Sequence, residues 1–185
     1  MQAPSGPLTA RPLQALLTGG DLTGPWALDP GQSSIRLTSR ALLGLVPVRG
    51  VFREISASGA IAPDGRVSGT ITVAAASIDT RNARRDTHLR SADFFDSTRH
   101  PDITFALDAI RPSGQCVTVA GRLTVRGRSR PLSFDATASA PRDGRIWLDA
   151  EVHINRADFG LTWNLLGLVS VHNTLTIHAV FTRPR

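Results

Sequence analysis

The side chains most able to do chemistry are concentrated between Asp79 and His100, where basic and acidic residues are interspersed. The basic members of this segment that could contact a ligand are Arg81, Arg84, Arg85, His88 and Arg90. Guanidinium groups offer several N–H donors in one plane, so this set could hold a phosphate or a carbonyl oxygen. The alternative is that the arginines pair with the four aspartates of the same segment and fix it against the domain. The residue types alone do not decide between these interpretations.

No residue pattern indicates an enzyme or a metal site. Asp86 and His88 are neighbours in sequence, but no nucleophile stands at a recognisable spacing and no Gly-x-Ser-x-Gly motif occurs. The histidines never recur four residues apart on a predicted helix, and the single cysteine, Cys116, excludes a zinc site built on cysteine pairs. The stretch from Gly121 to Gly127 lacks the Gly-Lys-Ser/Thr ending of a phosphate-binding loop. We therefore expect no catalysis, no metal and no cofactor.

Composition predicts one soluble domain. The chain has 185 residues, and its net charge of +6 comes from 21 basic residues that are all arginine. Together with the abundant alanine and glycine, this bias indicates a GC-rich genome more than an anion-binding surface, so we expect no nucleic-acid partner. Every apolar run is far shorter than the roughly 18 residues of a transmembrane segment. The first residues lack the pattern of a signal peptide, which favours a cytoplasmic location. The sequence is compatible with a homodimer.

Short segments that alternate apolar and polar residues fill the chain from Trp26 onward, separated by glycine, proline and aspartate. They lie at 35–37, 51–61, 67–73, 103–107, 117–125, 132–134, 146–154 and 175–181. These segments predict an all-β fold of about eight strands, arranged as an antiparallel meander. Pairing the first strand with the last removes both exposed edges, so we expect a closed barrel.

Two parts of the chain do not read as strands. Residues 83–96 predict a short helical insertion, because Asn82 and Ser91 can cap helical turns there. Residues 1–24 are rich in proline and glycine and predict an N-terminal arm, in which only 10–17 could form a short helix. The barrel domain is accordingly placed at 25–185.

An eight-stranded barrel either fills its interior with side chains or holds one small ligand. Small residues recur on the predicted inward faces, and the chain contains only seven Phe, three Trp and no Tyr. This composition favours a cavity for an apolar guest. Complete packing by Leu, Ile and Val is the alternative. Phe94 and Phe95 lie in the helical insertion, where both rings can lean over an apolar opening.

Several longer motifs stand out beside the alternating segments. They are the run from Ser77 to Asp96 with His100–Phe105, the stretches Gly121–Gly127, Arg130–Phe134 and Ile154–Leu161, and the start at Trp26–Pro30. Together these motifs resemble one known family, the YceI-like, polyisoprenoid-binding proteins. The resemblance covers roughly residues 26–183. It implies a lipocalin-like, eight-stranded barrel that takes up an isoprenoid chain, such as a polyprenyl lipid or an isoprenoid quinone, and it implies no catalytic reaction.

Together, the alternation and the resemblance yield a specific set of ligand-binding candidates. The expected cavity wall is Leu37, Phe52, Ile71, Val73, Phe94, Phe95, Phe105, Leu123, Trp147, Ile154 and Phe159. The expected head-group contacts are Arg40, His88 and Arg90. Bound in this way, the lipid would be stored, transported or protected. The alternative function is a stress-response interaction module with a packed barrel and a protein-binding loop at 79–100, and interior volume separates the two.

Overall fold

The computed structural model describes residues 19–41, 45–113, 116–139, 144–163 and 169–184. Its strands are β1 (Gly24–Leu28), β2 (Ser34–Ala41), β3 (Val46–Phe52), β4 (Ile55–Ile61), β5 (Val67–Ala74), β6 (Ile78–Asp79), β7 (Asp102–Ser113), β8 (Cys116–Val125), β9 (Arg128–Ser139), β10 (Ile146–Asn155) and β11 (His172–Thr182). The helical elements in this part of the chain are α2 (Ala83–Arg90) and the 3-10 turns η1 (Ala75–Ser77) and η2 (Arg156–Phe159). None of these helices is long and apolar enough to cross a membrane.

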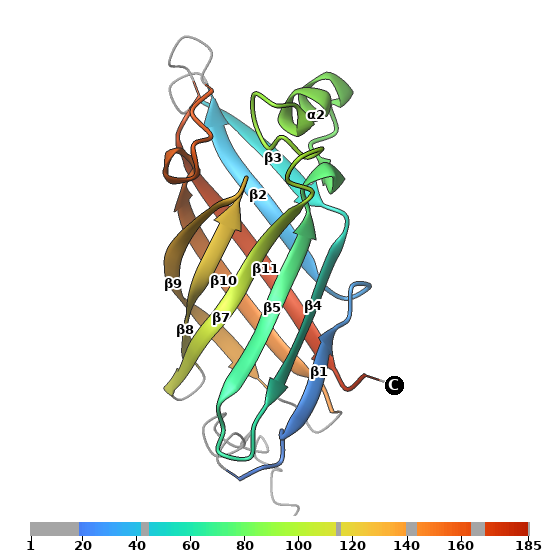
Figure 1. The fold of residues 1–185 in the computed structure, drawn as a ribbon, viewed down its shortest axis with the longest axis vertical. Helices are drawn as coiled ribbons and strands as arrows, with labels where there is room; N and C mark the ends of the chain where they lie inside the picture. Colours follow the sequence, from blue (N-terminus) through green and yellow to red (C-terminus); the bar gives the residue numbers. More distant parts are fainter. Residues whose placement is uncertain (1–18, 42–44, 114–115, 140–143, 164–168, 185) are drawn as a thin grey trace, which may run out of the picture.

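Eight of the strands form a closed antiparallel barrel, as Figure 1 shows. Strands β4, β5, β7, β8, β9, β10 and β11 pair in that order, and β1 joins the two ends by pairing with both β4 and β11. Closure leaves these eight strands without an open edge along the β1 seam. The predicted eight-stranded antiparallel barrel with a short helical insertion is confirmed.

The remaining strands β2, β3 and β6 extend the wall at one end of the barrel. Strands β1 and β2 share one edge of β11, with β2 opposite residues 174–178 and β1 opposite Phe181 and Thr182. Between them, the Asp29 N–H donates to the Val180 carbonyl, and the Val180 N–H donates to Ser33 Oγ. The chain therefore departs from a simple meander at β1, because β11 is long enough to pair with two strands along one edge.

Period-two alternation decides which side chains face the interior. On β8, Val117, Val119, Leu123 and Val125 are buried, and Gly121 occupies the same face between them. An added Cβ at Gly121 would lie 2.3 Å from the Ala106 carbonyl oxygen and 2.6 Å from Phe105 Cζ. Glycine is therefore required at this position by close packing against the neighbouring strand β7.

Residues 22–26 close the end of the barrel opposite α2. Leu22 and Trp26 are both buried, and Trp26 Nε1 donates a hydrogen bond of 2.8 Å to the Leu22 carbonyl. The Arg183 guanidinium lies over the Trp26 ring, 4.3 Å from its centroid. The last residues of the predicted N-terminal arm thus pack into the domain, whereas its predicted helix at 10–17 lies outside the described residues.

We predict that Gly121→Ala lowers the free energy of unfolding by about 1–3 kcal/mol, because the methyl group would overlap a backbone carbonyl and the Phe105 ring. Thermal or urea denaturation measures this change. The control is Ser133→Ala, an exposed position on the adjacent strand β9, where the expected change is within about 0.5 kcal/mol. Equal stability of the two variants would contradict the packing argument.

Candidate functional site

A cavity of about 740 Å³ occupies the end of the barrel that lies beneath α2. Its wall combines side chains from β2, β3, β5 and β7 to β11 with residues of α2 and of the segments that follow α2 and η2. The volume lies within the range of roughly 300–1,000 Å³ typical of small-molecule sites. The interior at this end of the barrel is therefore hollow, and side chains do not pack it completely.

Most of the predicted wall residues line this cavity. They are Leu37, Phe52, Ile71, Val73, Phe94, Phe95, Phe105, Leu123, Ile154 and Phe159. Phe95 packs edge-on against Phe52 with ring centroids 6.2 Å apart, and against Phe94 at 4.9 Å. The segment after α2 thus places two adjacent aromatic rings on the cavity, as its helical turn predicted.

Trp147 is the predicted wall residue that the structure places elsewhere. Its neighbours Ile146 and Leu148 line a smaller cavity of the barrel, and Trp147, which alternates with them, faces the other way. The Trp147 ring lies 5.7 Å from the ring of His178 on β11. The alternation from Ile146 to Ile154 already assigned Trp147 to the outer face, so its aromatic character misled the prediction.

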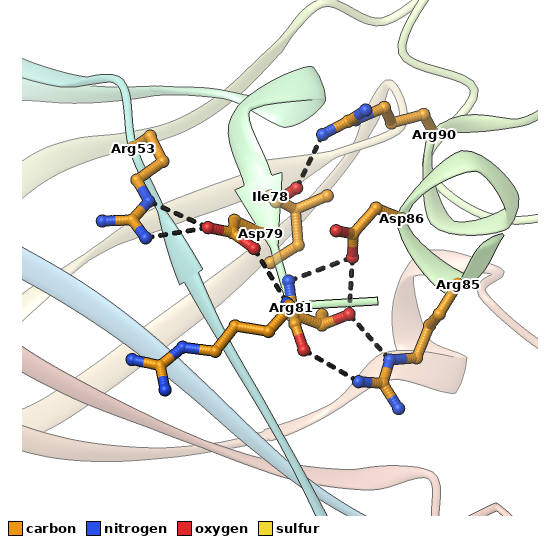
Figure 2. A network of polar contacts seen from close by, with 8 residues as sticks. Arg53, Ile78, Asp79, Arg81, Arg85, Asp86 and Arg90 are labelled. Atoms are coloured by element: carbon orange, nitrogen blue, oxygen red, sulfur yellow. Dashed lines mark hydrogen bonds and ion pairs between the residues drawn. The ribbon is translucent and has the colours of Figure 1, made fainter. Parts of the chain in front are cut away.

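A polar network attaches α2 to the barrel (Figure 2). Asn82 caps the helix by accepting the Arg85 N–H at 3.0 Å. The buried Asp86 carboxylate accepts hydrogen bonds from the Thr80 N–H at 3.0 Å and from Thr80 Oγ1 at 2.5 Å. Arg85 in turn donates to Thr80 Oγ1 at 2.7 Å and to the Thr80 carbonyl at 2.9 Å. These bonds fix the first turn of α2 over the cavity.

The predicted pairing of arginines with aspartates of the same segment is replaced by other partners. Asp79 accepts two hydrogen bonds from Arg53 of the β3–β4 connection and one from the Arg81 N–H. These hydrogen bonds keep the pKa of the Asp79 carboxyl below its ordinary value. Those from the Arg53 side chain have the largest effect, and the one from the Arg81 backbone has the next largest. Hydrogen bonding to the ionised carboxylate is the physical cause.

Two of the three predicted head-group residues do not line the cavity. Arg90 Nη2 donates to the Ile78 carbonyl at 2.8 Å, so its guanidinium connects α2 to β6 (Figure 2). Arg40 alternates along β2 with Ser39 and Ala41, which do line the cavity, and is exposed on the opposite face. The charge of both residues suggested a ligand contact. Instead, the alternation of β2 turns Arg40 away from the cavity, and the Ile78 carbonyl binds Arg90.

His88 is the predicted head-group residue that does line the cavity. Its ring centroid lies 4.2 Å from that of Trp163, which is 39% exposed. His88 Nε2 is buried without a hydrogen-bond partner among the described residues. Buried polar atoms are almost always paired, so an unpaired ring nitrogen on a residue of the cavity wall marks a candidate contact for a ligand atom.

Arg156 is a cavity residue that the sequence analysis did not identify. Its side chain is only 3% exposed and donates to the carbonyls of Ser170 at 3.1 Å, Trp163 at 2.9 Å and Leu161. The guanidinium carbon also lies 5.7 Å from the centroid of the Phe94 ring. Burial lowers the pKa of Arg156 from its ordinary value. The arginine within the Ile154–Leu161 motif, directly after an alternating strand, was the available signal.

Arg156 therefore brings a positive charge to the cavity wall, beside the apolar Phe94 ring. Its identified partners are backbone carbonyls, and within the described part of the chain it forms no ion pair. Carbonyl dipoles satisfy the N–H donors without cancelling the charge. Together with His88, Arg84 and Arg85, it makes the α2 end of the cavity basic.

A second cavity of about 150 Å³ occupies the opposite end of the barrel. Its wall includes Leu22 and Trp26, together with apolar side chains of the barrel strands. Within the described segments, no three histidine, cysteine, aspartate or glutamate side chains are grouped as a metal site requires. The chemistry offered by the barrel is thus a long apolar interior with one basic end.

Comparison with curated proteins identifies relatives over part of the chain. A UPF0312 protein of Pectobacterium carotovorum is 35% identical over 100 residues, which make up 51% of this chain and 52% of the relative. Protein YceI of Shigella flexneri is 33% identical over 100 residues with the same coverage. The aligned region thus spans about half the length of these curated relatives.

Solved structures share the barrel over most of the chain. Burkholderia cenocepacia BcnA matches with a TM-score of 0.75 at 24% identity, over 83% of this chain and 98% of that chain. A polyisoprenoid binding domain from Saccharophagus degradans matches with a TM-score of 0.71 at 16% identity, over 86% and 98%. The family model of the YceI-like domain matches residues 26–182. Since this match spans nearly the whole barrel, the chain belongs to the YceI-like domain family.

Proposed function

We propose that this protein binds an isoprenoid-type lipid inside the barrel, as a carrier or store and without catalysing a reaction. The observation that supports the proposal is the cavity of about 740 Å³, which is enclosed by apolar strands and basic at one end. The Saccharophagus degradans structure, described as a polyisoprenoid binding domain, has the same fold. A packed interaction module is less well supported, because a filled barrel would lack this volume.

The apolar wall provides the driving force for binding a chain. Each buried methylene contributes about 0.8 kcal/mol, so an isoprenoid chain of a few units binds without any polar contact. The wall carries aromatic rings from several separate places, among them Phe52 on β3, Phe94 and Phe95 after α2, and Phe105 on β7. Such a wall favours an apolar chain over a compact polar metabolite.

The basic end of the cavity is the proposed location of the ligand's head group. The residues that border the cavity there are Thr80, Asn82, Arg84, Arg85 and His88. A quinone carbonyl and a polyprenyl phosphate share the feature that matters, an oxygen that accepts hydrogen bonds. The chain would then extend from α2 toward the interior of the barrel.

Lipid analysis tests this proposal directly. Organic extraction of the purified protein, followed by mass spectrometry, is expected to release an isoprenoid lipid. Titration of the extracted protein with a prenyl quinone is expected to saturate, and the change in Trp163 fluorescence at the cavity should report it. If extraction yields no lipid and titration shows no saturable uptake, the proposed function is wrong.

A second prediction concerns cavity volume. Leu175→Trp adds an indole to the cavity wall on β11 and is expected to weaken binding of a prenyl quinone about tenfold or more. Displacing two methylenes already costs roughly 1.6 kcal/mol, which corresponds to that factor. The matched control is Thr176→Trp, which places the same indole on the exposed face of β11. Equal affinities of the two variants would place the ligand outside the barrel.

A third prediction concerns His88. His88→Leu keeps an apolar wall but removes the unpaired ring nitrogen, so a prenyl quinone should bind about threefold to tenfold more weakly. Squalene, an isoprenoid hydrocarbon without a head group, should bind the variant and the original protein equally well. Calorimetric titration with both probes measures the difference. A similar loss for both probes would show that His88 contacts the chain and not the head group.

A further inference from the structure

The two cavities share part of their wall where they meet inside the barrel. Four side chains from four different strands line both of them, namely Ile71 on β5, Phe105 on β7, Phe134 on β9 and Ile177 on β11. The Phe105 and Phe134 ring centroids are 5.7 Å apart, with the rings inclined at 51°. The barrel interior is therefore divided by a layer that these two aromatic rings dominate.

The position of the Phe105 ring depends on the absence of a side chain on the neighbouring strand. Phe105 Cζ lies 2.6 Å from the place where a Cβ of Gly121 would stand. The register of β7 and β8 pairs Leu107 with Gly121 and Phe105 with Leu123, which fixes this arrangement through the backbone. The ring thus fills a space that Gly121 leaves open, and it remains between the two cavities.

The wall of the smaller cavity is mainly apolar, so it matches the apolar tail of an isoprenoid chain. Apart from the Ser58, Ser68 and Thr70 positions, its wall is made of apolar residues and glycine, and it lies on the side of the partition away from the basic end. Its far side is closed by Leu22 and Trp26, which the hydrogen bond from Trp26 Nε1 holds together. A space of about 150 Å³ with such a wall suits a short hydrocarbon segment, and none of the described residues that line it is basic.

We propose that Phe105 and Phe134 separate the smaller cavity from the larger one and thereby limit the length of the isoprenoid that binds, so that the smaller cavity takes the tail end of a long chain only when one of these rings is moved or shortened. This inference rests on the proposed function, since it assumes that the chain lies in the larger cavity. A chain that reaches the partition can extend further only if a ring moves. Chains longer than the larger cavity therefore gain no affinity from their additional units.

The test measures affinity against chain length. Farnesol, geranylgeraniol and solanesol, which carry successively longer isoprenoid chains, are titrated into the protein and into the variant Phe105→Leu. In the original protein, affinity should stop rising once the chain reaches the partition. In Phe105→Leu, the ratio of the solanesol affinity to the farnesol affinity should rise about tenfold over the ratio in the original protein. Phe134→Leu, which opens the same partition from β9, should give the same result.

The control variant is Phe52→Leu, which removes the same atoms from the larger cavity and leaves the partition intact. It should not favour solanesol over farnesol. Circular dichroism and thermal melting of each variant verify folding. Because there are two partition variants, the test can still be carried out if one of them does not fold. Failure of every probe to bind the original protein would contradict the proposed function. Binding with an unchanged length dependence in both partition variants would overturn the subsite alone.

Discussion

Closure of the sheet along β11 is the constraint on which the rest of the structure depends. One edge of β11 pairs with β10, and the other edge is divided between β2 and β1. Backbone hydrogen bonding then satisfies every strand around the ring without the side chains having to fill the interior. A closed ring of eight strands can enclose a cavity, because its stability comes from the wall as well as from the core.

The division of that edge also makes the two ends of the barrel different. At the β1 end, Leu22 and Trp26 close the interior with apolar side chains. At the β2 end, the wall continues through β3 and β6 to α2, which the Asp86–Thr80 hydrogen bonds attach to the barrel. Among the described residues, one end is therefore mainly apolar and the other carries polar and basic groups. A lipid with a polar head and an apolar tail matches this gradient in one orientation only.

Much of the fold could be predicted from period-two alternation, because this pattern depends only on residues that are close in sequence. Alternation correctly predicted the inward faces of β5, β8, β10 and β11, and with them most of the cavity wall. Trp147 was assigned to the wall against that rule, and the structure follows the rule. The basic residues of the cavity wall were harder to predict, because Arg90 and Arg156 differ in tertiary contacts and not in residue type. Arg90 bonds to the Ile78 carbonyl, whereas Arg156 is buried beside Phe94.

The glycine at position 121 affects both the packing between β7 and β8 and the position of the Phe105 ring between the two cavities. Gly121 faces inward on β8, and the Phe105 ring uses the space that a larger residue would take. The ring therefore lies over β8, where it meets Phe134 of β9, the strand on the other side of β8. Without such a layer the two cavities would be one, and cavity length would follow from the length of the strands alone. In the proposed function, these two aromatic side chains set how far a chain extends into the barrel, independently of the length of the strands.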